Sequence, residues 1–395
     1  MITKEYRDML AQKSAIRELF DYGRARAAEV GADNVFDYSL GNPSVPVPRA
    51  FNEALARLAL SGRDIEVHGY SPSMGIPAVR EAIAASLKRR FALDYRAEHI
   101  FLTTGAAGAL AHALRAVAAP GSEVVTVAPY FPEYGPYVAG AGCMLRVVPA
   151  QTADFQIDLA AMEAALSPKT AAVLLNSPNN PSGAIYSIET LVRLADMLEV
   201  KQREFGHAIY LISDEPYREI LFAGQECPSP ARFYANTLTC YSFSKSLSLP
   251  GERIGYVAVH PEAEDAEFIA PVCAQISRGI GHNCPPSIIQ LAVAEVLEKT
   301  ADLRVYETNK NILYPALRRM GFACVEPGGT FYLFPEAPDG DSEGLSRRAK
   351  QFDLLLVPGT SFGCPGNFRI AFCIDTDKVE RSLPAFQKLA DSYFA

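Results

Sequence analysis

The chain has 395 residues, 49% of them hydrophobic and 21% charged, with a formal net charge of -8 and a pI near 5.4. Because this length exceeds what one compact core accommodates, we expect two domains in a soluble globular protein. The acidic balance and the lack of a dense basic block argue against nucleic acid or an anionic membrane surface as the general partner, while leaving room for a local phosphate pocket.

Targeting and metal-binding signals are weak. Residues 1–13 alternate charged and apolar side chains and lack the apolar core of a signal peptide, and no apolar stretch is long enough to span a bilayer. The eight cysteines are scattered, with no C-x-x-C pair and no Cys/His ligand spacing. We therefore expect reduced thiols, no metal site and a cytoplasmic location.

The N-terminal part of the chain opens with a helical pattern at 16–30, which Gly31 is suited to stop. A β-prone run at 100–102 then leads through the small-residue turn T-T-G-A-A-G into an alanine-rich helix. Free N–H groups at such a helix start make a ready anion site, although close packing alone would also explain small residues here.

Four short apolar runs in the middle of the chain alternate with helical patterns, which predicts a parallel α/β sheet. They cover 124–128, 171–175, 209–213 and 237–241, and each is followed by polar or aromatic residues. Since ligands bind along the carboxyl edge of open α/β sheets, these segments predict a single site there. A further run at 253–259 is expected to return antiparallel.

The polar groups after the last two of the four runs form a set suited to one cofactor. Asp214 and Tyr217 follow the run at 209–213. The run at 237–241 is followed by Ser242, Ser244, Lys245 and Arg253. Pyridoxal phosphate requires a lysine for a Schiff base, an acid for its pyridine nitrogen and donors for its phosphate. Ordinary structural roles stay open, because a lysine after a strand is usually at the surface and Asp214 could cap the following turn.

The C-terminal part has a mixed pattern. A helical pattern runs from 287 to about 299 and continues, with a break, to 320, and short strands are expected at 331–334, 354–357 and 368–372. This predicts a smaller α+β domain, which the N-terminal segment joins. We therefore expect an N-terminal segment at 1–48, a large cofactor-binding domain at 49–290 and a small domain at 291–395.

The segment 209–256 resembles the centre of the class I/II aminotransferases, which belong to the aspartate aminotransferase superfamily (fold type I) of pyridoxal-phosphate enzymes. The resemblance spans about 16–372. It implies the α/β architecture of fold type I, with a mostly parallel seven-stranded sheet in the large domain. It also implies pyridoxal 5′-phosphate as cofactor, and a homodimer with shared active sites.

The resemblance assigns the chemistry at the cofactor ring to four residues. Lys245 would form the Schiff base and carry the proton, and Asp214 would keep the ring nitrogen protonated. Tyr217 and Asn180 would hydrogen-bond the phenolate oxygen, and Asn180 would also contact the substrate carboxylate. From composition alone, the N-S-P-N-N-P-S-G segment around Asn180 is a plain turn.

The phosphate and the ring face are assigned in the same way. The residues implied for the phosphate are Gly105, Ala106, Ala107, Ser242, Ser244, Arg253 and, from the neighbouring subunit, Tyr70. Because Ala106 and Ala107 offer only backbone N–H groups, the phosphate would depend more on the serines and the arginine. Phe131 matches the aromatic residue that stacks on the ring, although an aromatic side chain at such a position is more often part of the core.

The substrate would be held mainly through its carboxylates. Arg369 resembles the arginine that binds the α-carboxylate in a bidentate manner, and Gly41 lies in the loop that closes over it. A structural salt bridge is the alternative for Arg369. Arg278 resembles an arginine that binds a distal carboxylate across the dimer interface, while a surface role is about equally compatible with its position. His282, in the same stretch, is more often structural.

The expected activity is transfer of an amino group between an L-amino acid and a 2-oxo acid by a ping-pong mechanism, with aspartate or glutamate as favoured substrates. Since fold and cofactor do not fix the reaction, a β-C–S lyase is the alternative, followed by an amino-acid decarboxylase. An effector-sensing domain of a transcription regulator is a third reading. It would need a DNA-binding segment, and only about fifteen residues precede the first family-like helix.

Overall fold

The computed structural model describes residues 2, 7, 10 and 15–394, and these residues form two compact units. The larger unit comprises 45–179 and 184–303. The smaller unit comprises the described residues up to Ser44, the short segment 180–183, and the chain from Arg304 onward. The domain borders expected after residues 48 and 290 stay a prediction.

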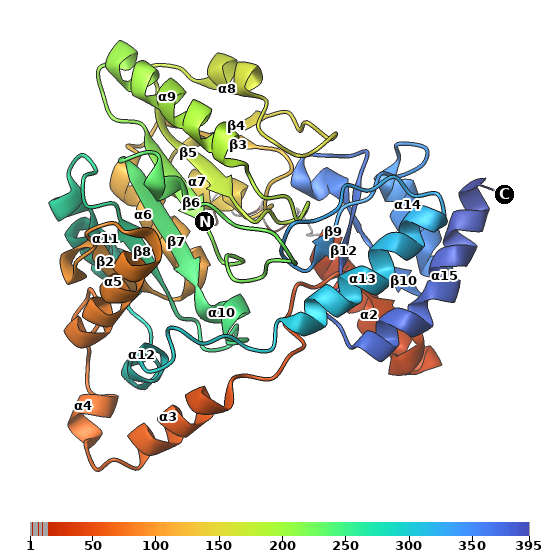
Figure 1. Ribbon diagram of the computed structural model, residues 1–395, viewed down its shortest axis with the longest axis horizontal. Coiled ribbons are helices and arrows are strands. Elements are labelled where there is room, and N and C mark those ends of the chain that lie inside the picture. Colours follow the sequence, from red (N-terminus) through yellow and green to blue (C-terminus); the bar gives the residue numbers. More distant parts are fainter. Residues whose placement is uncertain (1, 3–6, 8–9, 11–14, 395) are drawn as a thin grey trace. The chain divides into compact units, whose positions relative to one another are not determined.

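The larger unit is built on a seven-stranded sheet (Figure 1). In spatial order the strands are β2 (Ile100–Thr103), β8 (Gly255–Val259), β7 (Thr237–Ser242), β6 (Tyr210–Asp214), β5 (Thr170–Asn176), β3 (Glu123–Val127) and β4 (Met144–Val148). Only β8 is antiparallel to its neighbours, so the mostly parallel sheet and the antiparallel return strand are both confirmed.

Helices cover both faces of this sheet because neighbouring strand residues point to opposite sides. Val124 packs into one core, and Val125 into the other. The first core is covered by α6 (Gly105–Val117), α7 (Tyr134–Gly140) and α11 (Ala266–Ile280). The opposite face is covered by α3 (Arg49–Ala59), α5 (Pro77–Phe91), α8 (Leu159–Ala165), α9 (Ile188–Phe205) and α12 (Ser287–Ala294). Two short helices, α4 (Asp64–His68) and α10 (Phe243–Ser246), complete the unit.

The smaller unit is α+β, as the C-terminal pattern predicts. Its strands are β1 (Phe36–Asp37) parallel to β10 (Leu354–Leu355), and the antiparallel set β11 (Val357–Pro358), β12 (Phe368–Ala371) and β9 (Tyr332–Leu333). Its α-helices are α2 (Ala15–Val30), α13 (Arg304–Arg319), α14 (Ser342–Ala349) and α15 (Thr376–Phe394). Short 3-10 turns of the smaller unit occur at Ala32–Asn34, Lys350–Phe352 and Gly359–Phe362. The larger unit has such turns at Ala97–His99 and Pro230–Arg232.

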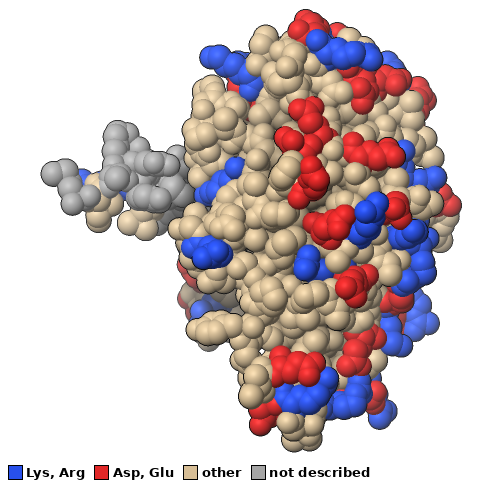
Figure 2. All heavy atoms as spheres, turned by 90° about the vertical axis from the view of Figure 1, so that its left-hand side faces the viewer, with Lys and Arg blue, Asp and Glu red and all other residues tan. Residues whose placement is uncertain are grey.

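The surface carries charges of both signs. Basic and acidic side chains are interspersed on the face shown in Figure 2. The structure also has exposed ion pairs, such as Arg89 with Glu298 at 2.6 Å. Among the described residues, none of the helices combines the length and hydropathy needed for a membrane span.

Candidate active site

The sheet register gathers the polar strand ends of the larger unit at one edge. Asn176 at the end of β5 pairs with Asp214 at the end of β6. Across the next strands, Ser242 in β7 pairs with Gly255 in β8, which in turn pairs with Thr103 in β2. Residues far apart in sequence therefore lie side by side at the carboxyl edge of the parallel strands, where ligands bind in this class of sheet.

Asp214 is a buried carboxylate with one oxygen unpaired. Tyr134 donates its hydroxyl to Oδ2 at 2.7 Å, while Oδ1 has no hydrogen-bond partner among the described residues. Burial first, and then the charge of Glu215, raise the pKa of Asp214 to about 7, against the lowering effect of the Tyr134 hydrogen bond. A buried carboxyl group with a free oxygen fits a protonated ring nitrogen, because an unpaired buried charge is costly.

Lys245 lies on the four-residue helix α10, directly after β7, and is half-buried. Its Nζ lies 5.9 Å from the centre of the Tyr217 ring, and Tyr217 itself is buried. The contact has the geometry of a cation–π interaction. Three of the residues expected to act on the cofactor ring, Lys245, Tyr217 and Asp214, therefore belong to the same unit and to the same edge of its sheet.

The expected phosphate donors also lie together in the larger unit. Ser242 and Ser244 are buried, their Oγ atoms are 2.7 Å apart, and Ser242 accepts from the backbone N–H of Ser244. Helix α6 begins at Gly105, whose φ is +79°, and a Cβ there would meet Nη2 of Arg253 at 3.0 Å. Arg253 also donates to the carbonyl of Thr104 at 3.3 Å. A free helix start beside a guanidinium fits a phosphate dianion.

Behind this helix start lies a pair of histidines whose arrangement the sequence does not reveal. His282 Nε2 and the hydroxyl of Thr104 are within hydrogen-bond distance, and the His282 ring stacks on His112 at 5.2 Å. Burial is the main cause that lowers the pKa of both histidines. Both are therefore neutral at pH 7, and His282 contacts the start of helix α6 through Thr104.

The remaining expected residues of the larger unit are Phe131, Tyr70 and Arg278, and each has different neighbours. Phe131 is half-buried and packs edge-on against Tyr134, with ring centres 5.8 Å apart. Tyr70 and Arg278 are exposed, and neither side chain makes a hydrogen bond or ion pair with a described residue. Within a single chain, these two residues are thus available at the surface.

The smaller unit holds the expected substrate arginine, Arg369 of β12. Its side chain is buried at 2% exposure and donates to the Asn180 side chain at 3.2 Å and to the Ser39 carbonyl at 2.5 Å. Its guanidinium carbon lies 4.7 Å from the centre of the Tyr332 ring. Nε has no hydrogen-bond partner among the described residues, and no described carboxylate pairs with Arg369. A buried guanidinium without an acid is prepared for a carboxylate ligand.

Gly41 and Asn180 belong to the surroundings of that arginine. A Cβ at Gly41 would clash with the Tyr332 hydroxyl, so only glycine fits at this approach of the two chain segments. Asn180 is buried and shares the segment 180–183 with Gly183, whose carbonyl accepts from the backbone N–H of Gly328 at 2.9 Å. The three expected substrate contacts of the smaller unit thus lie in one packed region.

Several known proteins are similar to this chain over most of its length. The family described as "Aminotransferase class I and II" matches residues 33–386. An aspartate/prephenate aminotransferase from Thermus thermophilus is 31% identical over 88% of this chain and 89% of its own. A solved aminotransferase from Eubacterium rectale is 42% identical with a TM-score of 0.97 and covers 100% of both chains. An aspartate aminotransferase from Thermus thermophilus, solved with maleate, is 27% identical with a TM-score of 0.86 and covers 98% of this chain and 100% of its own.

Proposed function

The chain belongs to the class I and II aminotransferases, and on that premise we propose that its amino-group donor and acceptor are a dicarboxylic L-amino acid and 2-oxo acid of the aspartate or glutamate type. The protein is a pyridoxal-phosphate-dependent transaminase with fold type I architecture. When bound, the cofactor withdraws electrons from the substrate Cα so that its proton can leave.

The residues of the larger unit are suited to hold that cofactor. We assign Asp214 to the protonated ring nitrogen because its free Oδ1 is buried, and Lys245 to the covalent bond with the cofactor and to proton transfer at Cα. The helix start at 105–107, with Arg253 and the two serines Ser242 and Ser244, is assigned to the phosphate. Tyr217 is assigned to the phenolate oxygen, and Phe131 to the ring face.

The observation that carries the substrate proposal is the buried Arg369 guanidinium, which has no acidic partner among the described residues. We assign it to the substrate α-carboxylate, with Asn180 and the Gly41 loop beside it. Support for a second carboxylate comes from the relatives, which are named for aspartate and prephenate, and from the relative solved with maleate. The exposed Arg278 is the residue we assign to that distal carboxylate.

The setting in which the enzyme works is part of the same proposal. We propose a homodimer that completes each site with Tyr70 of the neighbouring chain, in a reducing cytoplasmic compartment and in amino-acid biosynthesis. In support, Tyr70 is fully exposed in the single chain, and all eight cysteines are free thiols.

The experiment that tests the proposal is absorbance spectroscopy of the purified protein loaded with pyridoxal phosphate. We expect aspartate or glutamate to shift the cofactor band to that of pyridoxamine phosphate, and 2-oxoglutarate to restore it. A shift with alanine or aromatic amino acids but not with aspartate or glutamate would contradict the dicarboxylate proposal. An unshifted band, with release of pyruvate and ammonia from cysteine-type substrates, would favour the lyase instead.

A further inference from the structure

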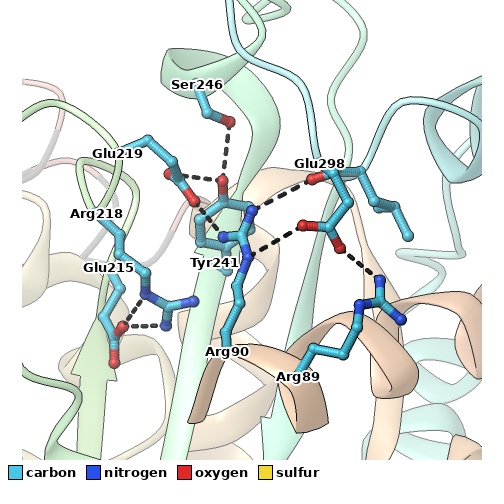
Figure 3. A network of polar contacts seen from close by, with 9 residues as sticks. Arg89, Arg90, Glu215, Arg218, Glu219, Tyr241, Ser246 and Glu298 are labelled. Atoms are coloured by element: carbon cyan, nitrogen blue, oxygen red, sulfur yellow. Dashed lines mark hydrogen bonds and ion pairs between the residues drawn. The ribbon is translucent and has the colours of Figure 1, made fainter.

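Tyr241 is a buried residue at the centre of a polar network that runs from buried to exposed side chains (Figure 3). Its hydroxyl lies 2.8 Å from a carboxylate oxygen of Glu219 and 2.8 Å from the hydroxyl of Ser246. Ser246 directly follows Lys245 on helix α10, and Glu219 lies in the segment that begins after Asp214. One phenol thus connects the helix of the proposed catalytic lysine with the segment of the proposed catalytic acid.

The available protons give this chain of hydrogen bonds a direction. Burial first, and then the charge of Glu219, raise the pKa of Tyr241 well above its ordinary value, so the phenol keeps its proton at neutral pH. A carboxylate can only accept, and a phenol has one proton to donate. The geometry makes the Tyr241 hydroxyl the donor to both Glu219 and Ser246, so its single proton is shared between two acceptors. Removal of this one hydroxyl would therefore break both contacts.

Glu219 is in turn fixed from the other side. Arg90 of helix α5 pairs with it at 2.8 Å and also donates to the carbonyl of Leu297 at 3.4 Å. The ion pair is partly shielded from solvent, since the side chains of Arg90 and Glu219 are 29% and 12% exposed. Such a pair holds its geometry better than an exposed one, which solvent screens. The phenol is therefore anchored to the body of the larger unit.

The ring of Tyr241 makes the second connection. The Arg218 guanidinium lies 5.3 Å from the centre of this ring, and Arg218 donates to the buried carboxylate of Glu215, the residue directly after Asp214. The other ring contacts are Tyr256, stacked at 5.0 Å, and Phe243, edge-on at 5.1 Å. The Tyr241 hydroxyl thus contacts Glu219 at one end of the segment 215–219. The Tyr241 ring is connected to Glu215 at the other end through Arg218.

We propose that Tyr241 is a positioning residue of this aminotransferase, which orients Lys245 by holding the hydroxyl of Ser246. The proposal rests on the proposed role of Lys245. A helix of four residues has little stability of its own, so its orientation depends on such anchors. Because catalytic groups must stay near their productive geometry, loss of the anchor would slow the steps that use the lysine amine and leave ligand contacts intact.

The test compares Tyr241→Phe with Tyr256→Phe. The first variant keeps the ring contacts and removes the hydroxyl that bonds to Ser246 and Glu219. The second removes the hydroxyl of a buried tyrosine in the same stack, a hydroxyl that bonds to neither Ser246 nor Glu219. We expect Tyr241→Phe to lower kcat by roughly 10-fold or more with KM changed less than about 3-fold, and Tyr256→Phe to behave as the wild type.

A measurement without turnover separates the lysine from the ligand contacts. We expect the cofactor-free Tyr241→Phe protein to form its covalent bond with added pyridoxal phosphate roughly 10-fold more slowly, followed by absorbance. Its affinity for 4′-deoxypyridoxine 5′-phosphate, which keeps the ring and the phosphate but lacks the aldehyde, should equal that of the wild type. Equal slowing in Tyr256→Phe, or weaker binding of the deoxy compound, would overturn the positioning role.

Ser246→Ala decides the question even if Tyr241→Phe does not fold. If Tyr241 acts through Ser246, the serine variant should slow bond formation to the same degree, and the double variant should be no slower than either single one. Independent, additive effects, or a Ser246→Ala protein that matches the wild type, would overturn the proposal. A wild-type protein that binds no cofactor would instead contradict the proposed function, so the two failures are distinguishable.

Discussion

At the scale of single residues, Asp214 shows how the fold changes the chemistry of a side chain. In the cofactor-free protein its pKa of about 7, set mainly by burial, lies above that of an aspartate in the unfolded chain. Between the two pKa values the folded protein binds more protons than the unfolded chain, so the free energy of unfolding falls as the pH rises from about 4 to about 7.

We therefore predict that cofactor-free wild type is less stable at pH 8 than at pH 5, with Asp214 contributing about 2–3 kcal/mol of the difference. Urea denaturation at the two pH values measures this, with Asp214→Asn as the reference that cannot ionise. The asparagine variant should lose correspondingly less stability over the same range. Parallel losses in both proteins would mean that Asp214 titrates near its ordinary pKa.

Arg369 carries the second prediction at this scale. Arg369→Lys keeps the positive charge but removes the planar pair of donors, so we expect KM for the amino acid to rise roughly 100-fold. Cofactor affinity, measured by absorbance titration, should stay unchanged. Arg26→Lys is the matched control, because Arg26 belongs to the same unit and pairs with Asp353 at 2.7 Å. An unchanged KM in Arg369→Lys would contradict the assignment.

Candidate site residues can be predicted from the sequence where neighbouring residues form a recognisable pattern. Their hydrogen-bond partners from distant parts of the chain cannot be predicted in this way. Lys245 and Asp214 could be singled out because each follows an apolar run with other polar groups nearby. Tyr134 could not, because it lies 80 positions before Asp214 and its hydrogen bond exists only once β3 and β6 share a sheet. The same holds for Tyr241, which in the sequence is one more apolar strand residue.

At the scale of elements, the start of helix α6 depends on a glycine. Gly105 has a φ of +79°, and a Cβ there would lie 3.0 Å from Arg253. We predict that Gly105→Ala weakens binding of pyridoxal phosphate by roughly 10-fold, measured by titration of the cofactor-free protein. Its free energy of unfolding should fall by about 1–2 kcal/mol because of the left-handed backbone conformation.

Gly121→Ala separates the two effects. Gly121 has a φ of +89° and lies in the turn before β3, where a Cβ would meet no atom within 4 Å. This variant should lose similar stability and keep its cofactor affinity. If both alanine variants bind the cofactor equally well, the start of α6 does not hold the phosphate.

The elements themselves follow closely from the pattern where burial is complete. β5, β6 and β7 agree with the expected apolar runs within one or two residues, because both faces of these strands are covered. The edge strand β4 was not expected, since most of its residues are exposed or half-buried and its sequence M-L-R-V-V gives no strong signal. Its strand state depends on pairing with β3, a contact that a local pattern does not contain.

At the scale of the whole molecule, the single chain exposes large hydrophobic side chains that another protein chain could bury. Leu60, Ile65 and Tyr70 are 86, 91 and 109% exposed, and they lie close together in sequence around helix α4. Large exposed side chains grouped in this way are typical of an interaction surface. They favour the proposed dimer, in which Tyr70 of one chain would serve the phosphate site of the other.

Complementation between two inactive variants tests whether the sites are shared. In a hybrid of Lys245→Ala and Tyr70→Ala chains, one site combines the intact lysine of one chain with the intact tyrosine of the other. Random assembly should therefore restore about a quarter of the wild-type activity, because half of the dimers are hybrids with one complete site each. Lys245→Ala mixed with Asp214→Asn should restore none, since both residues belong to the larger unit of one chain. Equal activity in the two mixtures would place Tyr70 in the site of its own chain, and a monomer in sedimentation would exclude sharing altogether.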